Sequence, residues 1–208
     1  AGQCPIGGLV KRWHNKIRDW LLKWVEERTE MPVAKEPFVS EWDYWERNPT
    51  TGVSELVQAQ LDGGFTFPKG RQGYFDVTIV NAATTQAQTL HERAHKAGAA
   101  ALEAVRGKVA KYPPDKHPAA TLVPFAIEAL GCPSEEALQF LRDLAPEDPR
   151  QRAVVLRAAH YRLSTLIAMR QAELLMAAEG ASHYGAAPRG VQFGRSRQPA
   201  RPAPAATI

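Results

Sequence analysis

The sequence predicts a mixed α/β fold in which a helix is followed by three strands, a helix, a fourth strand and two helices. Apolar residues recur at helical spacing over residues 10–27, and short β-rich runs separated by turn residues follow. Alanine-rich stretches of helical length flank the later apolar run at residues 121–127. With 208 residues and 44% apolar content, the chain is expected to form one domain with appendages.

The N-terminal elements are predicted from the spacing of apolar residues and from the positions of Pro and Gly, which interrupt helices and strands. Residues 10–27 predict an amphipathic helix, which Pro32 ends. Residues 33–39 are expected to form a strand. Residues 41–52 (EWDYWERNPTTG) are expected to be a loop, because they are charged and interrupted by Pro and Gly.

Two carboxylates, Asp62 and Asp76, are the most informative feature of the chain. Asp62 closes a predicted strand over residues 56–61, and Asp76 lies in another over residues 74–80. The segment 68–73 between them predicts a hairpin turn, which brings both carboxylates to one end of a sheet. Such a pair suits Mg²⁺, which binds one or two carboxylates together with waters and a substrate phosphate. The alternative is that both are ordinary acids at strand ends.

The C-terminal half predicts a long helix over residues 86–112, which contains two glycines and ends at a diproline. A buried strand is expected over residues 121–127 despite Pro124. Ser134 is the expected N-cap of the next helix, which runs to Leu144. A last helix is expected from residue 149 or 150 to residue 178.

The charge of the chain favours a polyanionic partner. The formal net charge is +4, and no acid follows Glu179, whereas four arginines do. This pattern supports nucleic-acid contact, for which Arg195 and Arg197 are candidates, but it does not distinguish DNA from RNA. Residues 180–208 are rich in Gly, Ala, Pro and Arg and are expected to be an irregular tail that cannot fold alone.

Other features bound the class of protein. No run of eighteen apolar residues occurs, so no membrane span is expected. Cys4 and Cys132 are too few for a disulfide framework, which favours a reducing compartment. The chain starts without Met, so we expect a processed protein or a piece of a longer one.

Five short segments suggest a family. They are RWHN at residues 12–15, LD at 61–62, FDVTIV at 75–80, KVAKY at 108–112 and VPFAIEALG at 123–131. In this order they resemble sequence motifs of the restriction-like endonuclease domain in site-specific non-LTR retrotransposon polyproteins. That domain belongs to the PD-(D/E)XK nuclease superfamily, and the predicted αβββαβ order resembles its core. The resemblance covers roughly residues 4–175.

The resemblance implies an organisation and a fold. It implies a restriction-endonuclease-like core with a mixed sheet over residues 31–179, with C-terminal helices, followed by the tail at 180–208. Residues 1–30 would hold the first helix and, in Cys4 and His14, a remnant of a zinc knuckle. One Cys and one His are too few to hold Zn²⁺, so no zinc is expected from the cysteines.

Two departures from the family pattern bear on activity. Leu61 stands where the family has Pro, and Gly63 and Gly64 follow Asp62, which is expected to loosen the backbone beside a metal ligand. Thr78 stands where the superfamily motif has its lysine. A lysine near the end of the following helix, at residues 86–112, would have to replace it.

The resemblance implies roles for named residues. Asp62 and Asp76 would hold Mg²⁺, with Glu36 as a possible third metal ligand. Lys108 or Lys111 would stabilise the charge on the phosphate, and Lys111 is preferred because Tyr112 and the diproline fix that helix end. The alternative for both lysines is an exposed helix end.

Three further residues have less specific roles. Arg12 and His14 could contact nucleic-acid phosphate, although packing of the first helix is preferred for His14. Glu128 is expected to act as a cap or to balance local charge rather than as a ligand.

Two functions follow, and a third, a small DNA-binding protein without catalysis, stays open. The first is a Mg²⁺-dependent DNA endonuclease that nicks target DNA for retroelement insertion, acting in the nucleus. The alternative is a catalytically retired nuclease fold that serves as a structural subunit of a mitochondrial or other organellar RNA–protein assembly, in contact with RNA or protein subunits. The Gly63-Gly64 departure, the missing Met and the arginine-rich tail motivate this alternative.

Overall fold

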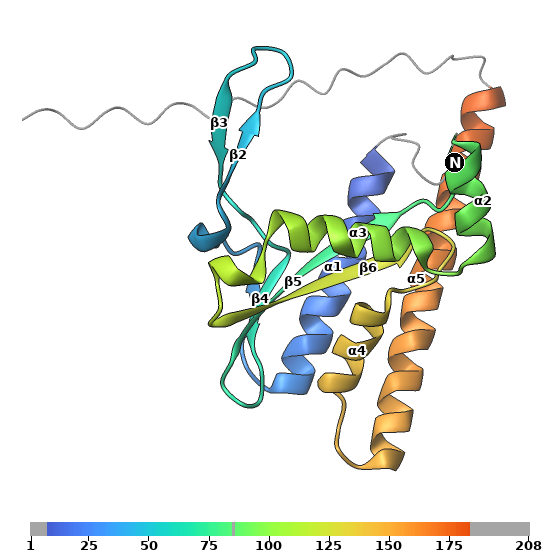
Figure 1. The fold of residues 1–208 in the computed structure, drawn as a ribbon. Helices are drawn as coiled ribbons and strands as arrows, with labels where there is room; N and C mark the ends of the chain where they lie inside the picture. The colour runs from blue at the N-terminus through green and yellow to red at the C-terminus, as the bar shows by residue number, and fades with distance from the viewer. Residues whose placement is uncertain (1–7, 85, 184–208) are drawn as a thin grey trace, which may run out of the picture.

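The computed structural model, which describes residues 8–84 and 86–183, confirms a mixed α/β fold (Figure 1). A four-stranded sheet lies at its centre, and helices pack on both of its faces. In chain order the elements are α1 (Leu9–Thr29), β1 (Ala34–Lys35), η2 (Ser40–Trp42), β2 (Tyr44–Arg47), β3 (Ser54–Val57), β4 (Gly63–Thr66), β5 (Gln72–Val80), α2 (Ala87–His95), α3 (Ala99–Lys111), η3 (Pro114–Lys116), β6 (Ala120–Glu128), α4 (Glu135–Asp143) and α5 (Pro149–His183).

The central sheet is mixed and has the strand order β1-β4-β5-β6. β4 pairs antiparallel with β1 and with β5, whereas β5 and β6 are parallel. Parallel neighbours need a crossover connection, and α2 and α3 provide it. The predicted hairpin turn between β4 and β5 is confirmed, and Gly70 adopts a φ of 83° within it.

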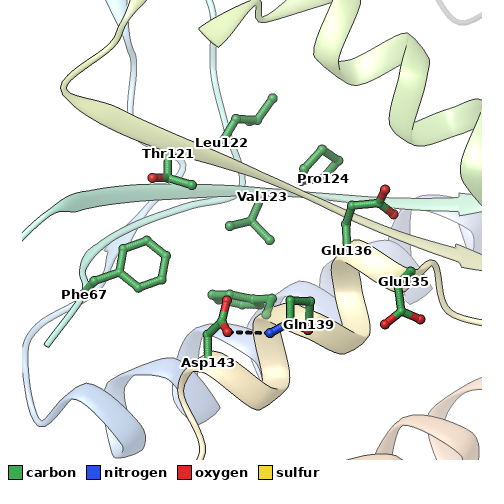
Figure 2. Close-up of a pocket in the computed structure, with 10 residues that line it drawn as sticks. Phe67, Thr121, Leu122, Val123, Pro124, Glu135, Glu136, Gln139 and Asp143 are labelled. Carbon is green, nitrogen blue, oxygen red and sulfur yellow. Dashed lines mark hydrogen bonds between the residues drawn. The ribbon is translucent and has the colours of Figure 1, made fainter. Parts of the chain in front are cut away.

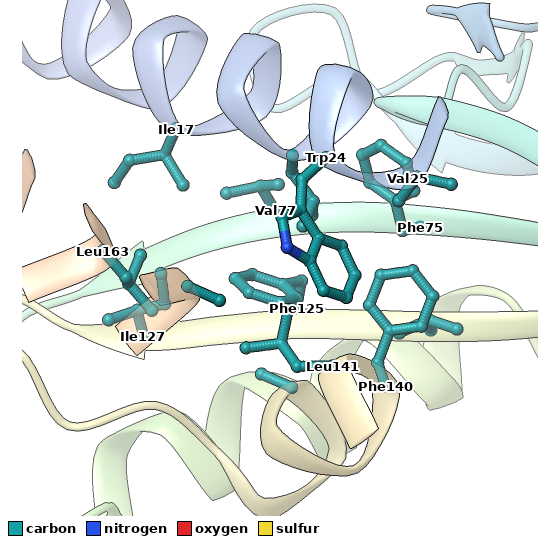
Figure 3. Close-up of a cluster of buried hydrophobic side chains, with 14 of the residues drawn as sticks. Ile17, Trp24, Val25, Phe75, Val77, Phe125, Ile127, Phe140, Leu141 and Leu163 are labelled. Carbon is teal, nitrogen blue, oxygen red and sulfur yellow. The ribbon is translucent and has the colours of Figure 1, made fainter. Parts of the chain in front are cut away.

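The two faces of the sheet carry different helices. Phe75, Val77, Phe125 and Ile127 belong to the main core cluster with apolar side chains of α1, α4 and α5 (Figure 3). Ala126, between two of these residues, packs instead on Ala101 and Val105 of α3. Since successive strand residues point to opposite faces, α3 covers the face opposite α1, α4 and α5. Asp76, between Phe75 and Val77, therefore points to the α3 side.

The prediction of a loop over residues 41–52 is wrong. Residues Tyr44–Arg47 form β2, which pairs with β3 in a separate hairpin that projects from the body (Figure 1). The Asn48 side chain accepts a hydrogen bond from the Thr50 N–H (2.9 Å), and Gly52 has a φ of 70°, so Pro and Gly interrupt the segment only at the turn.

The predicted strands on either side of this hairpin are shorter than expected. The strand at residues 33–39 reduces to Ala34–Lys35 and an isolated bridge from Phe38 to Gln60. The strand at residues 56–61 is replaced by β3, which ends at Val57, and by β4, which starts after Asp62. Asp62 therefore precedes a strand rather than closing one.

The C-terminal half agrees with the sequence more closely. The helix expected at residues 86–112 is divided into α2 and α3, because Gly98 adopts a left-handed conformation (φ 78°). The strand around Pro124 is confirmed as β6, and its position at the sheet edge tolerates a residue without an N–H. The Ser134 hydroxyl accepts from the Ala137 N–H (3.2 Å), which confirms the predicted N-cap of α4. The last helix extends to His183 rather than ending near residue 178.

Gly63 and Gly64 do not loosen the chain. Both are buried in β4, and a Cβ atom on Gly63 would lie 2.2 Å from Cζ of Phe75. The aromatic ring occupies the space that a side chain would need, so these glycines permit close packing. The expectation of a loosened backbone beside Asp62 is wrong. No helix in the described ranges is long and apolar enough to cross a membrane.

We predict that Gly63→Ala lowers the free energy of unfolding by about 1–3 kcal/mol, because the added methyl overpacks against Phe75. Gly107→Ala is the control, since a Cβ there meets no atom within 4 Å in the middle of α3. That change is expected to stabilise the protein by about 0.5–1 kcal/mol. Urea denaturation measures both, and equal effects of the two substitutions would contradict the packing argument.

Candidate active site

The β4–β5 hairpin brings Asp62 and Asp76 together. The Asp62 N–H donates to the carbonyl of Phe75 (3.1 Å), and Gly63 lies in register with Phe75, so Asp62 and Asp76 lie opposite each other. Asp62 Oδ2 accepts a hydrogen bond from the Val77 N–H (2.7 Å). Both side chains are buried, with exposed fractions of 8% for Asp62 and 7% for Asp76. The predicted convergence of the two carboxylates is confirmed.

Lys108 reaches the site from α3. Its ammonium forms an ion pair with Asp76 Oδ2, and its side chain remains about one quarter exposed. Val105, one turn earlier, packs on the sheet through Ala126, so this face of α3 points toward β5 and β6. A cation therefore lies at the carboxylate pair although β5 carries Thr78 instead of lysine.

Lys111 lies elsewhere, although the sequence favoured it over Lys108. Its ammonium lies over the ring of Tyr44, 4.5 Å from the centroid, and near Tyr112 at 5.1 Å. Three residues along a helix turn the side chain by about 60° from its starting direction. Lys111 lies six residues beyond Val105 and is therefore turned by about 120° from the residue that packs on the sheet, which directs it toward Tyr44 of the β2–β3 hairpin.

His14 approaches the pair from α1. Its Nε2 lies 3.2 Å from Asp62 Oδ2 and 3.0 Å from the carbonyl oxygen of Val77. A nitrogen that faces two acceptors carries a hydrogen, which fixes the Nε2–H form or the imidazolium. The sequence preferred a packing role for His14. The RWHN motif at residues 12–15 was the signal that could have identified His14 as part of the site.

The two carboxyls have opposite pKa shifts. Burial works to raise the pKa of Asp62, but the hydrogen bond and the charge of His14 bring the net shift below the ordinary value. Burial raises the pKa of Asp76, and the negative charge of Asp62 adds to this rise, while Lys108 opposes it. The hydrogen bond to Asp62 raises the pKa of His14. Asp62 is therefore the more readily ionised member of the pair.

The residues present fit Mg²⁺ better than Zn²⁺. Two facing carboxylates match the small protein contribution that Mg²⁺ usually takes. Asp76 Oδ2 is buried and pairs with the Lys108 ammonium, and a carboxylate oxygen with two lone pairs retains acceptor capacity beside that contact. Within the described residues, no cluster of three or more His, Cys, Asp or Glu side chains could hold a metal.

The Glu36 carboxylate does not join the Asp62–Asp76 pair. Its backbone N–H donates to the Asp62 carbonyl (3.2 Å), so the two residues are neighbours along the sheet. Its carboxylate, however, forms an ion pair with the buried guanidinium of Arg18. A role as third metal ligand stays a prediction that this contact does not favour.

The other residues that the sequence analysis discussed are not part of the Asp62–Asp76 pair. Arg12 donates to Glu173 of α5 (2.9 Å). Glu128 accepts from the Ala100 N–H (3.0 Å) in the first turn of α3, which is the capping role expected for it. Cys4, Arg195 and Arg197 lie outside the described residues, so the zinc-knuckle and tail predictions stay predictions.

A separate pocket of about 370 Å³ lies between β6 and α4 (Figure 2). Its floor includes Val123 and Phe140, whereas Glu135, Glu136 and Asp143 supply carboxylates. This negative charge would repel a phosphate, and the pocket shares no lining residue with the Asp62–Asp76 pair. It is therefore not part of the candidate active site.

Comparison with known proteins adds no family assignment. No protein-family model matches the chain, and a search of curated proteins found no match.

The His14–Asp62 pair predicts a pH dependence of stability. Because the folded-state pKa of His14 lies above its ordinary value of 6.5, the contribution is fully present below pH 6.5. It is lost as the pH rises through the folded-state pKa. We expect the stability difference between wild type and His14→Gln to be largest near pH 6 and to shrink at higher pH, as measured by urea denaturation.

His160→Gln is the matched control, because His160 is exposed on α5. Because His160 lies on the helix surface, this variant is expected to change the free energy of unfolding by no more than about 0.5 kcal/mol. A difference for His14→Gln that grows with pH would show that the imidazolium form does not stabilise the fold.

Proposed function

We propose that the chain is a Mg²⁺-dependent DNA endonuclease of retroelement origin that nicks target DNA. The observation that supports this proposal is the buried pair Asp62 and Asp76 on neighbouring positions of a mixed sheet, with Lys108 in contact with Asp76. The resemblance rests on five sequence motifs, and the order of the core elements agrees with the order that it implies. DNA is the expected partner, and the nucleus the expected compartment.

Each residue of the site has a distinct role in this proposal. Asp62 and Asp76 would hold Mg²⁺, which supplies Lewis acidity toward a phosphoryl oxygen and lowers the pKa of a bound water. Lys108, partly exposed beside Asp76, would stabilise negative charge that develops on the phosphate. His14 is a positioning residue, because its hydrogen bond holds the Asp62 carboxylate in place and favours its ionised form.

One observation favours the second candidate, a retired nuclease fold within an organellar RNA–protein assembly. Glu36, the third acidic candidate, is paired with Arg18, which leaves two carboxylates for a metal. Each of these already has a partner: the His14 imidazole N–H for Asp62 and the Lys108 ammonium for Asp76. Such pairing can serve the stability of the fold without any metal.

Plasmid nicking in the presence of Mg²⁺ or Mn²⁺ separates the two candidates. We expect nicking by wild type and its loss in the Asp62→Ala/Asp76→Ala double variant, because the metal ligands are gone. Circular dichroism and thermal melting establish that the variant is folded. A folded wild-type protein that does not nick under any of these conditions would favour the structural subunit.

The two lysines provide a matched comparison. Lys108→Ala is expected to lower the nicking rate by roughly 10²–10³-fold, the usual effect of removing one stabilising charge at a reacting phosphate. Lys111→Ala is expected to retain nearly full activity, because its ammonium lies over Tyr44 rather than at Asp76. The opposite result would restore the preference for Lys111 that the sequence suggested.

A further inference from the structure

Helix α5 is apolar on two opposite faces. One face is buried and packs on the main core through residues such as Leu163, Leu166 and Ile167. The opposite face is exposed, yet it also carries apolar side chains, among them Val154, at 67% exposure, and Tyr161, at 75%. A surface helix that covers a single core normally has a polar outer face. The outer face of α5 therefore has a composition that the fold of one chain does not require.

The exposed apolar residues form a regular stripe. Their spacing alternates between four and three residues over three heptads, which is the seam of a helix that pairs with another helix. Met169 and Met176, both about half exposed or more, lie beside the seam. The Thr165 hydroxyl donates to the Tyr161 carbonyl (2.8 Å), so it presents no unsatisfied polar group. The stripe consists of Val154, Ala158, Tyr161, Thr165, Ala168, Ala172 and Leu175.

The charges beside the stripe favour one orientation. Arg157 and Arg162 border it on opposite sides, and both lie in its N-terminal half. In a parallel pair, the heptad positions of these residues place Arg157 of each helix against Arg162 of the other. Like charges at these positions are repulsive. An antiparallel pair instead places Arg162 beside Met169 and Met176 of the other helix, and Arg157 beside Ala178, so that neither arginine meets another arginine.

The sizes of the side chains favour the same orientation. When the seams of two copies run antiparallel, Leu175 of one lies against Ala158 of the other, and Tyr161 lies against Ala172. Each large side chain then meets a small one, which lets the two helices stay at an even distance. A parallel pair would stack Tyr161 on itself and Ala172 on itself, which gives layers of unequal size.

We infer that the outer stripe of α5 is a dimerisation surface, on which a second copy of this chain pairs antiparallel about a two-fold axis. Such an interface is self-complementary, as closed dimers require. Helix α5, which carries the stripe, lies at one side of the molecule (Figure 1). The inference does not depend on the proposed nuclease activity, because the stripe contains none of the site residues.

Sedimentation equilibrium of the full chain tests the inference with matched alanine substitutions. Ala172→Glu places a carboxylate in the seam, and Ala153→Glu places one on α5 outside it; both alanines are exposed. We expect wild type and Ala153→Glu to be dimers, and Ala172→Glu to raise the dimer Kd at least roughly tenfold, because burial of an unpaired charge is costly. Ala168→Glu, also in the seam, is expected to act alike.

Far-UV circular dichroism is expected to be unchanged in all these variants, since none of the substituted side chains is buried. A monomeric wild type throughout the micromolar range would overturn the inference. Equal weakening of the dimer by Ala153→Glu and Ala172→Glu would also overturn it, because the seam would then have no special role.

Cysteine cross-linking tests the orientation. In a Cys4→Ser/Cys132→Ser background, Ala158→Cys protein is mixed with Leu175→Cys protein under mild oxidation. The antiparallel pair predicts a disulfide between the two different variants as the main product. Disulfides of Ala158→Cys with itself as the main product would indicate a parallel pair and overturn the proposed arrangement.

Discussion

The register between β4 and β5 is the constraint on which the site depends. It places Gly63 beneath the ring of Phe75, and it places Asp62 opposite Asp76. Because strand side chains alternate, a slip of one residue would turn Phe75 and Val77 away from the main core and Asp76 into it. The apolar core thus fixes the pairing that brings the carboxylates together. The site is positioned by the same packing that holds the sheet, rather than by a flexible loop.

Electrostatics joins the two layers of the fold at this point. A buried carboxylate without a partner is strongly destabilising, and two adjacent ones also repel each other. His14 approaches Asp62 from α1, and Lys108 contacts Asp76 from α3, which covers the other face of the sheet. Each helix therefore supplies one hydrogen-bonding partner to one carboxylate, an imidazole from α1 and an ammonium from α3. The pKa shifts of the two carboxyls are opposite. At Asp62, burial raises the pKa, but the hydrogen bond and charge of His14, together with the Val77 N–H, outweigh it; at Asp76, burial prevails.

Local signals predicted the parts of the structure that depend on local chemistry. The turn before β5, the strand around Pro124 and the Ser134 N-cap each follow from a few neighbouring residues, and each is confirmed. The choice of Lys108 over Lys111 depends on how α3 is rotated on the sheet, which depends on Val105 and Ala126 meeting in three dimensions. The pairing of Glu36 with Arg18 likewise joins residues from two elements. Pattern and spacing do not contain this information.

Helix α5 connects the outer surface of the molecule to the site. Its Glu173 accepts hydrogen bonds from Arg12 and from the Trp13 indole, each at 2.9 Å, and these residues immediately precede His14 on α1. The inner face of α5 and Glu173 therefore set the position of the helix that holds the imidazole against Asp62. The outer face takes no part in this support. Its apolar stripe lies on the opposite face from these contacts, so pairing with another chain would leave the support of His14 in place.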